Sequence, residues 1–191
     1  MADRTLVAGA GITFDLSVPG QLIISATGAS TGGGTGGGTG GGGTGGNTGG
    51  GTGHRHWRVL LLTSASGTTP SCVALEFRTA SGGASAATGG TPLASNQAYG
   101  AAASAFDGDG STFWESNAAA VANEYLGYDF GAGAAPAIVE IAWTCRADAG
   151  AAQSPLTGKV QSSDDGTTWA DAWAFTASTW TAGLTQTFSH P

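Results

Sequence analysis

A tract of glycine and threonine divides this sequence and limits most strongly what it can fold into. From Gly28 to Gly53 nearly every residue is Gly or Thr, and such side chains cannot build a hydrophobic core. The tract could be a flexible tether with a root-mean-square reach of about 25–30 Å. It could also be a polyglycine helical bundle shared between chains. Its threonines do not keep a three-residue period, which favours the tether, so we expect three parts: residues 1–27, a linker over 28–53, and a globular domain over 54–191.

The first part reads as a β-hairpin. Within residues 5–27, apolar residues alternate with polar or small ones, Pro19-Gly20 forms a turn, and Leu22-Ile23-Ile24 returns. A hairpin of this size is marginal in water by itself. We therefore expect it to pack against identical chains or against another protein.

The third part is predicted to be an all-β sandwich of roughly eight short strands. The segment 57–63 is apolar throughout and predicts a central strand. Residues 140–146 alternate, which places Ile141, Trp143 and Cys145 on the inward face. Asp164-Asp165-Gly166 predicts a hairpin turn, and no segment predicts a helix. Four tryptophans are expected in the core because their neighbours alternate as strands: Trp57, Trp114, Trp143 and Trp169.

Charge and hydropathy exclude several classes of partner. With 13 acidic and 6 basic residues the net charge is −7, so nucleic acid is not expected as a partner. No apolar run approaches the roughly 20 residues that span a bilayer, and the N-terminus lacks the apolar core of a signal peptide. We therefore expect no membrane insertion. Cys72 and Cys145 are expected to be buried thiols, and no zinc-type spacing is present.

The loop from Ala105 to Trp114 gathers oxygen atoms between two aromatic residues. Its sequence is A-F-D-G-D-G-S-T-F-W. Asp107, Asp109 and Thr112 could coordinate calcium, which prefers carboxylate, hydroxyl and carbonyl oxygens. The alternative is a loop closed by its own Asx turns and capped by Trp114.

These motifs, in their order, resemble the discoidin-like (coagulation-factor C-type, galactose-binding-like) domains, in the variety found in bacteriophage fibre and tail proteins. Besides the loop over 105–114, the likeness rests on Y-L-G-Y-D-F-G at 125–131, V-E-I-A at 139–142 and Q-S-S-D-D-G-T-T-W at 161–169. Two earlier segments, 56–59 and 73–78, also match. The resemblance covers about residues 54–191 and implies a jelly-roll β-sandwich.

The resemblance also implies where a ligand would bind. Related domains bind sugars on the loops at one end of the sandwich, through an exposed aromatic ring and polar side chains. Tyr99, Arg146, Asp148 and Trp180 lie in loop-like contexts and are the predicted ligand-binding residues. In calcium-binding relatives a Glu from an early strand completes the ion's ligand shell. Here that position is Ala74, which supplies no carboxylate. Calcium is the only cofactor that we consider, and we expect it to bind weakly.

Two histidines at the start of the domain suggest a second kind of metal site. His54 and His56 would lie on one face of an extended strand. Three chains meeting there could offer their imidazoles to one iron or zinc ion, as in some phage spikes. The alternative is that His56 replaces the Tyr usual in relatives and that His54 ends the linker.

The expected function is binding without catalysis, because no Ser-His-acid grouping with a nucleophile elbow is present and the paired aspartates sit in turns, unlike glycosidase carboxylates.

The first hypothesis is a bacteriophage virion protein, a fibre, spike or tail component made in the host cytoplasm and released by lysis. Residues 1–27 would anchor it to other virion proteins or form a homo-oligomer, most simply a trimer, and the C-terminal domain would attach to host-surface glycans. One alternative is a structural decoration or fibre subunit without a ligand, and another is a bacterial carbohydrate-binding module.

Overall fold

The computed structural model describes residues 12–15, 23–26, 52–97, 99–117 and 121–191. The chain divides into two compact units, Met1–Gly45 and Gly46–Pro191. The architecture is all-β, as predicted. Among the described residues the only helical turns are two short 3-10 elements, η1 (Ala102–Ala105) and η2 (Ala149–Gln153), and no helix there is long and apolar enough to cross a membrane.

The first unit contains the predicted hairpin. Strand β1 (Ile12–Asp15) pairs antiparallel with β2 (Ile23–Ala26). Ile12 lies opposite Ala26, and Asp15 lies opposite Ile23. The turn expected at Pro19-Gly20 and the linker residues 28–51 lie outside the described residues.

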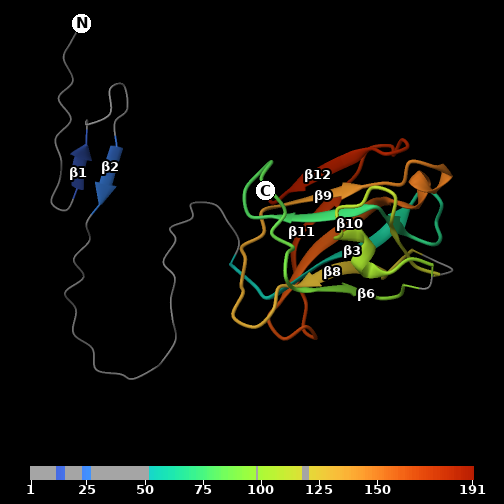
Figure 1. Ribbon diagram of the computed structural model, residues 1–191, viewed down its shortest axis with the longest axis horizontal. Coiled ribbons are helices and arrows are strands. Elements are labelled where there is room, and N and C mark those ends of the chain that lie inside the picture. The colour runs from blue at the N-terminus through green and yellow to red at the C-terminus, as the bar shows by residue number, and fades with distance from the viewer. Residues whose placement is uncertain (1–11, 16–22, 27–51, 98, 118–120) are drawn as a thin grey trace, which may run out of the picture. The chain divides into compact units, whose positions relative to one another are not determined.

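The second unit is a sandwich of two antiparallel sheets, one of five strands and one of three (Figure 1). The larger sheet has the order β11 (Ala170–Thr176), β10 (Pro155–Ser163), β3 (His56–Ser64), β8 (Tyr125–Asp129) and β6 (Thr91–Ala94). The smaller sheet has the order β12 (Thr185–Ser189), β9 (Glu140–Thr144) and β5 (Ala74–Arg78). The central strand expected over 57–63 is therefore confirmed as β3. A short pair, β4 (Ser71–Cys72) with β7 (Trp114–Glu115), lies outside these sheets.

The core fills the space between the two sheets. Alternate residues of β3 and β9 point inward, and Trp57, Trp143 and Cys145 are each at most 1% exposed. Trp114 is fully buried, as expected. Trp169 is not in the core: it is only half-buried, and its ring lies 4.0 Å from the guanidinium carbon of Arg58. The alternation that predicted its burial ends in the turn before β11.

Two further sequence predictions are confirmed by local geometry. The loop between β10 and β11 turns at Gly166, whose φ of +72° is one that glycine adopts without strain. Both cysteines are buried and unbridged. Burial raises the pKa of the Cys72 thiol well above its ordinary value, so this thiol is protonated at neutral pH.

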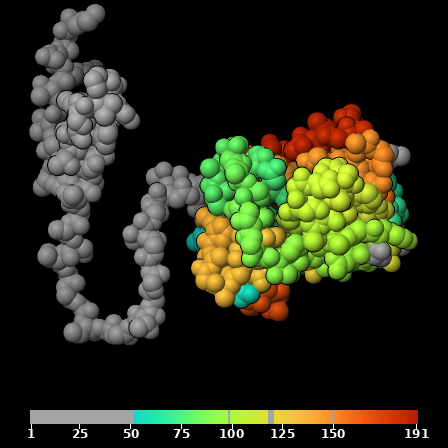
Figure 2. Space-filling model, viewed as in Figure 1, coloured from blue at the N-terminus to red at the C-terminus, as the bar shows by residue number. Residues whose placement is uncertain are grey.

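Strand β3 defines two opposite ends of the sandwich. At its start, Arg55 and His54 bond through their backbones to Phe130 and Pro136, and we call this region the His54 end. At its far end, the backbone of Ser66 bonds to Ala152 in η2, which follows Arg146; we call this region the Arg146 end. In Figure 1 the chain enters the sandwich at the left, and η2, coloured orange, lies at the right. Much of the surface facing the viewer in Figure 2 is formed by the green to yellow connecting segments.

Candidate functional site

A hollow of about 210 Å³ at the Arg146 end brings together residues that are distant in sequence. It is lined by the tip of the 105–114 loop, by Val73 beside β5, and by the segment after β9. The lining residues are Val73, Gly110, Ser111, Phe113, Arg146, Ala147 and Asp148. Two of the four predicted ligand-binding residues, Arg146 and Asp148, therefore share one hollow with the loop that was predicted to gather oxygens.

Arg146 is held in place from several sides. Its Nε donates to Asp148 Oδ1 at 3.0 Å and its Nη2 to Asp148 Oδ2 at 2.6 Å, while Nη1 donates to Glu115 Oε2. The guanidinium carbon lies 3.8 Å from the centre of the Phe113 ring. Such a bidentate, stacked guanidinium has a fixed direction. The hydrogen bonds from Arg146 and from the Gly150 N–H lower the pKa of Asp148.

Glu115 and Gln153 form a second layer behind Arg146. Gln153 donates to Glu115 Oε1 at 3.3 Å and to the Thr69 hydroxyl at 2.9 Å, and it accepts from Ser71 at 3.0 Å. This network ties η2 to the short β4–β7 pair. Sequence reasoning missed Phe113, Glu115 and Gln153 as parts of the site, because their partners are 31 to 84 residues away.

Tyr99 lies at the same end but does not line the hollow. Its backbone N–H donates to the carbonyl of Glu115 at 3.3 Å. Its side chain is 69% exposed, and among the described residues it is the one strongly exposed large hydrophobic side chain. Tyr99 is thus the aromatic residue best placed to meet a ligand that extends beyond the hollow.

The structure corrects the expectation for Trp180. This residue does lie in a loop, between β11 and β12, but its side chain is only 8% exposed. Its indole N–H donates to the Pro155 carbonyl at 2.8 Å. A ring packed into the core with its one donor engaged cannot stack on a sugar. The polar character of the surrounding sequence did not reveal that the loop folds back over the sandwich.

The 105–114 loop is closed by its own hydrogen bonds. Asp107 accepts from the Asp109 N–H at 2.8 Å and from the Thr112 hydroxyl at 2.8 Å. Asp109 accepts from the Ser111 N–H and hydroxyl, which lower its pKa. These are the Asx turns of the alternative reading. Calcium binding stays a prediction, and the described residues contain no group of three or more His, Cys, Asp or Glu side chains suited to a metal ion.

The position that the resemblance assigns to a calcium-ligating Glu does lie beside this loop. Ala74 of β5 lines a second hollow, of about 310 Å³, together with Gly108 and Phe106. The fold therefore brings β5 next to the loop, and in this chain the residue presented there is a methyl group.

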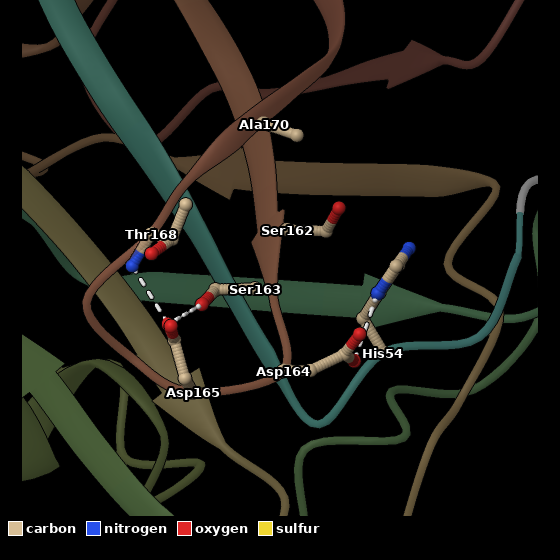
Figure 3. A pocket seen from close by; sticks show the side chains of 7 residues that line it. All are labelled: His54, Ser162, Ser163, Asp164, Asp165, Thr168 and Ala170. Carbon is tan, nitrogen blue, oxygen red and sulfur yellow. Dashed lines mark hydrogen bonds and ion pairs between the residues drawn. The ribbon is translucent and has the colours of Figure 1, made fainter.

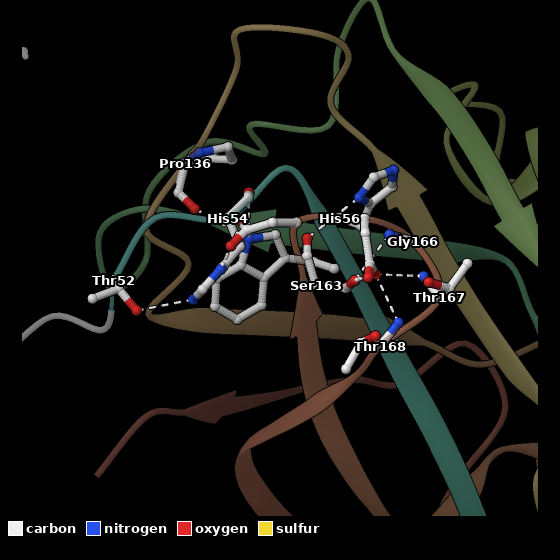
Figure 4. A network of polar contacts seen from close by, with 11 residues as sticks. Thr52, His54, His56, Pro136, Ser163, Gly166, Thr167 and Thr168 are labelled. Atoms are coloured by element: carbon white, nitrogen blue, oxygen red, sulfur yellow. Dashed lines mark hydrogen bonds and ion pairs between the residues drawn. The ribbon is translucent and has the colours of Figure 1, made fainter. Parts of the chain in front are cut away.

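The two predicted histidines contact different partners at the His54 end (Figure 4). His54 lies 2.9 Å through Nδ1 from Asp164 Oδ1 and 2.9 Å through Nε2 from the Thr52 hydroxyl. His56 is buried and contacts the Ser163 carbonyl and Asp129. The hydrogen bond from Arg55 lowers the pKa of Asp129 to about 2 against the opposing effect of burial. Metal binding between chains by these histidines stays a prediction.

Comparison with known families gives one match. The F5/8 type C domain model matches residues 85–191, more than half of the chain. No curated protein and no solved structure matches. The matched region begins after β5, yet β3 and β5 pair with the matched strands β8, β10 and β9, so the sandwich includes residues upstream of the match.

Proposed function

The chain belongs to the F5/8 type C, or discoidin-like, domain family, and on that basis we propose that it binds host-surface glycans at the Arg146 end without catalysing a reaction and without a resident cofactor. The family supports a binding role in general. The ligand class, the site and the biological setting are our proposal.

One observation carries the proposal: Arg146, Asp148 and the 105–114 loop converge on a single hollow. The side chain of Asp148 is 58% exposed, so its carboxylate can accept hydrogen bonds from sugar hydroxyls. Phe113 and the exposed Tyr99 supply apolar surface for sugar C–H groups. Because Glu115 and Asp148 together outweigh the charge of Arg146, a neutral sugar fits the hollow better than an acidic one.

We propose further that the chain is a bacteriophage virion protein. The support is the likeness of residues 54–191 to the phage variety of this domain and the arrangement of hairpin, Gly/Thr tract and sandwich. Residues 1–27 would attach to other virion proteins or form a trimer. Several tethered copies would turn weak sugar binding into useful avidity if the linker lets them bind together.

A structural role without a ligand is the second candidate. The observation that favours it is the saturation of Arg146, which donates to two carboxylates and stacks on Phe113. A guanidinium held in this way stabilises the loops around it whether or not a ligand binds. In this case the domain would decorate a particle or extend a fibre.

Glycan-array and cell-binding measurements on the full chain separate the two candidates. We expect Asp148→Ala and Tyr99→Ala each to weaken binding by about 1–3 kcal/mol, roughly 5- to 150-fold. Asp171→Ala is the matched control, because this carboxylate is similarly exposed at 48% but lies on β11, away from the hollow. If the unaltered chain binds no host glycan or cell in any oligomeric form, the structural role stands.

A further inference from the structure

We propose that the outer face of the five-stranded sheet binds an acidic side chain of a partner protein, and that Arg58 of β3 holds its carboxylate. This role goes beyond glycan binding at the Arg146 end and does not depend on it. The neighbours of Arg58 along the strand, Trp57 and Val59, are buried in the core. Because side chains alternate along a strand, Arg58 points to the opposite, outer face of the sheet.

Arg58 differs from the other cations by having no carboxylate partner. Every other Lys or Arg that the structure describes forms an ion pair. The pairs are Arg55 with Asp129, Arg78 with Glu76 and Glu140, Arg146 with Glu115 and Asp148, and Lys159 with Asp171. Burial lowers the pKa of Arg58, against a smaller opposing effect of Tyr125. Arg58 has therefore lost part of its hydration without gaining an anion, although charges in that position are normally paired.

Two aromatic rings and an amide fix the direction of the Arg58 guanidinium. Its central carbon lies 4.7 Å from the centre of the Tyr125 ring and 4.0 Å from that of Trp169. Its Nε donates to Gln161 Oε1 at 2.8 Å. The two Nη groups have no hydrogen-bond acceptor within the described part of the chain. They form the edge of a fixed, planar fork, and this is the geometry that binds both oxygens of a carboxylate at once.

The groups that hold Arg58 are themselves held in place. Gln161 is 7% exposed, and its amide donates to Asp171 Oδ1 at 2.7 Å. Trp169 belongs to the turn between β10 and β11, where Asp165 accepts from Ser163 and from the Thr168 N–H (Figure 3). The same turn borders a hollow of about 240 Å³ at the His54 end. Because this turn is closed by its own hydrogen bonds, the site needs little ordering when a ligand arrives.

Gly127 of β8 leaves space beside Arg58. It lies opposite Arg58 in the sheet, and a Cβ at this position would come within 2.7 Å of the Arg58 Cβ and 2.5 Å of the Trp57 carbonyl oxygen. Its φ is not in the left-handed region, so the backbone conformation does not require glycine. What requires glycine is the close approach of β3, and any side chain here would displace Arg58.

The surroundings of Arg58 define the ligand class. Leu60 and Leu93 are half-buried on the same face, because Leu60 is two residues from Arg58 and Leu93 lies opposite Gly127. The oxygens of Asp171 already accept from Lys159 and Gln161. The cation is thus the unpaired charge of an otherwise aliphatic surface. A glutamate flanked by aliphatic side chains matches both features, whereas a sugar acid would leave the leucines uncovered.

Nuclear magnetic resonance titration of the full chain tests this role. The probes are acetyl-Leu-Glu-Leu-amide and its uncharged match acetyl-Leu-Gln-Leu-amide, with glucuronic acid and inorganic phosphate as other anions. We expect the Glu peptide to shift the Arg58 Nε–H and Trp169 indole N–H signals in a saturable way. Its dissociation constant should be lower than that of the Gln peptide by about tenfold or more, because hydrogen bonds between two charged groups are the stronger kind.

Two variants separate the guanidinium fork from charge in general. Arg58→Lys keeps the charge but loses the fork, and we expect it to weaken binding of the Glu peptide by about fivefold or more. Lys159→Gln is the matched control, since it removes a cation of the same sheet that is already paired, and binding should change by less than about twofold. Melting temperatures of both variants establish that the sandwich is intact.

Several results would overturn the assignment of Arg58. These are the absence of a saturable shift with the Glu peptide, an equal response to the Gln peptide, or an equal loss of binding in Lys159→Gln and Arg58→Lys. Tighter binding of glucuronic acid or phosphate would assign the site to another class of ligand. Arg146→Ala should leave the peptide shifts intact even if it abolishes attachment to host glycans, so the two sites can fail separately.

Discussion

The two ends of the sandwich use polar residues in different ways. At the Arg146 end, the guanidinium, Glu115, Asp148 and Gln153 satisfy one another almost completely. At the His54 end, Asp165 and Ser163 are satisfied, whereas Ser162 and one oxygen of Asp164 lack partners among the described residues. A charged residue in a loop is therefore a weak guide to free binding capacity. What counts is how many of its hydrogen bonds the fold has already used.

The residues that hold the loops in place at the Arg146 end differ from those that are free to contact a ligand. The saturated network at the Arg146 end fixes loops that come from four parts of the chain, and this makes it a good scaffold for a ligand contacted mainly by Asp148 and Tyr99. The hollow at the His54 end is slightly larger, about 240 Å³ against about 210 Å³, and fewer of its polar groups are paired within the described residues.

The largest effect is expected from truncating the tryptophan that supports the Arg146 end. Trp114 is fully buried, and its indole N–H donates to the Asn96 carbonyl at 2.7 Å. Trp114→Ala should lower the free energy of unfolding by about 3–5 kcal/mol through the cavity that it leaves. Urea denaturation measures this change. Tyr99→Ala, at an exposed position of the same end, should change stability by less than about 0.5 kcal/mol, and an equal loss for both would contradict the packing described.

A smaller loss is expected from breaking the saturated network itself. Arg146→Ala leaves Glu115, whose side chain is 14% exposed, without its cationic partner. We expect the unfolding free energy to fall by about 1–3 kcal/mol. Lys159→Ala is the control, because it removes an exposed ion pair with Asp171 that contributes roughly 0–1 kcal/mol. If the two variants are equally stable, the network is not the scaffold that we describe.

The loss of folding stability in acid should come mainly from carboxylates at the His54 end. Burial raises the pKa of Glu140, but hydrogen bonds from the Gly82 N–H, Arg78 and Ser81 outweigh it and lower the pKa from 4.5 to about 2. Glu140 begins β9 four residues after Pro136, whose carbonyl accepts from the His54 N–H at this end, and the pKa of Asp129 at the same end is also lowered to about 2. Because both pKa values are depressed in the folded state, the stability they contribute is present above about pH 4.5 and is lost as the pH falls toward 2.

Denaturation curves recorded between pH 7 and pH 2 test this response. Glu140→Gln should be less stable than the unaltered chain at pH 7 and should show a flatter dependence on pH. Asp148→Asn, which alters an exposed carboxylate at the Arg146 end, should keep most of the slope. If Asp148→Asn flattens the dependence of stability on pH more than Glu140→Gln does, this dependence arises at the Arg146 end and the prediction is wrong.

The smallest effect is expected from calcium. The oxygens of Asp107 and Asp109 already accept hydrogen bonds within their loop, and Ala74 contributes no carboxylate. Millimolar calcium should stabilise the chain by less than about 1 kcal/mol. Thermal unfolding with and without a chelator measures this, and a rise above about 5 °C would reveal a real site. Asp107→Asn should abolish any such rise.

Much of the fold was predictable because it depends on local pattern. Alternation identified the paired strands at 12–15 and 23–26, the central strand β3 and the inward face of β9. The turn at Gly166 followed from the positive φ that glycine tolerates. Each of these features involves residues that are neighbours in sequence, so their periodicity and turn chemistry carry the necessary information.

The chain's own sequence thus determined the all-β class, the family and the segments from which the sites are built. Only the tertiary structure decided which of those residues are free to act. It buried Trp180, left Trp169 half-exposed, saturated Arg146 and placed the hydroxyl of Ser162 against an open hollow. The physical reason is that exposure and hydrogen-bond satisfaction depend on contacts between segments far apart along the chain, and a single sequence does not display those contacts.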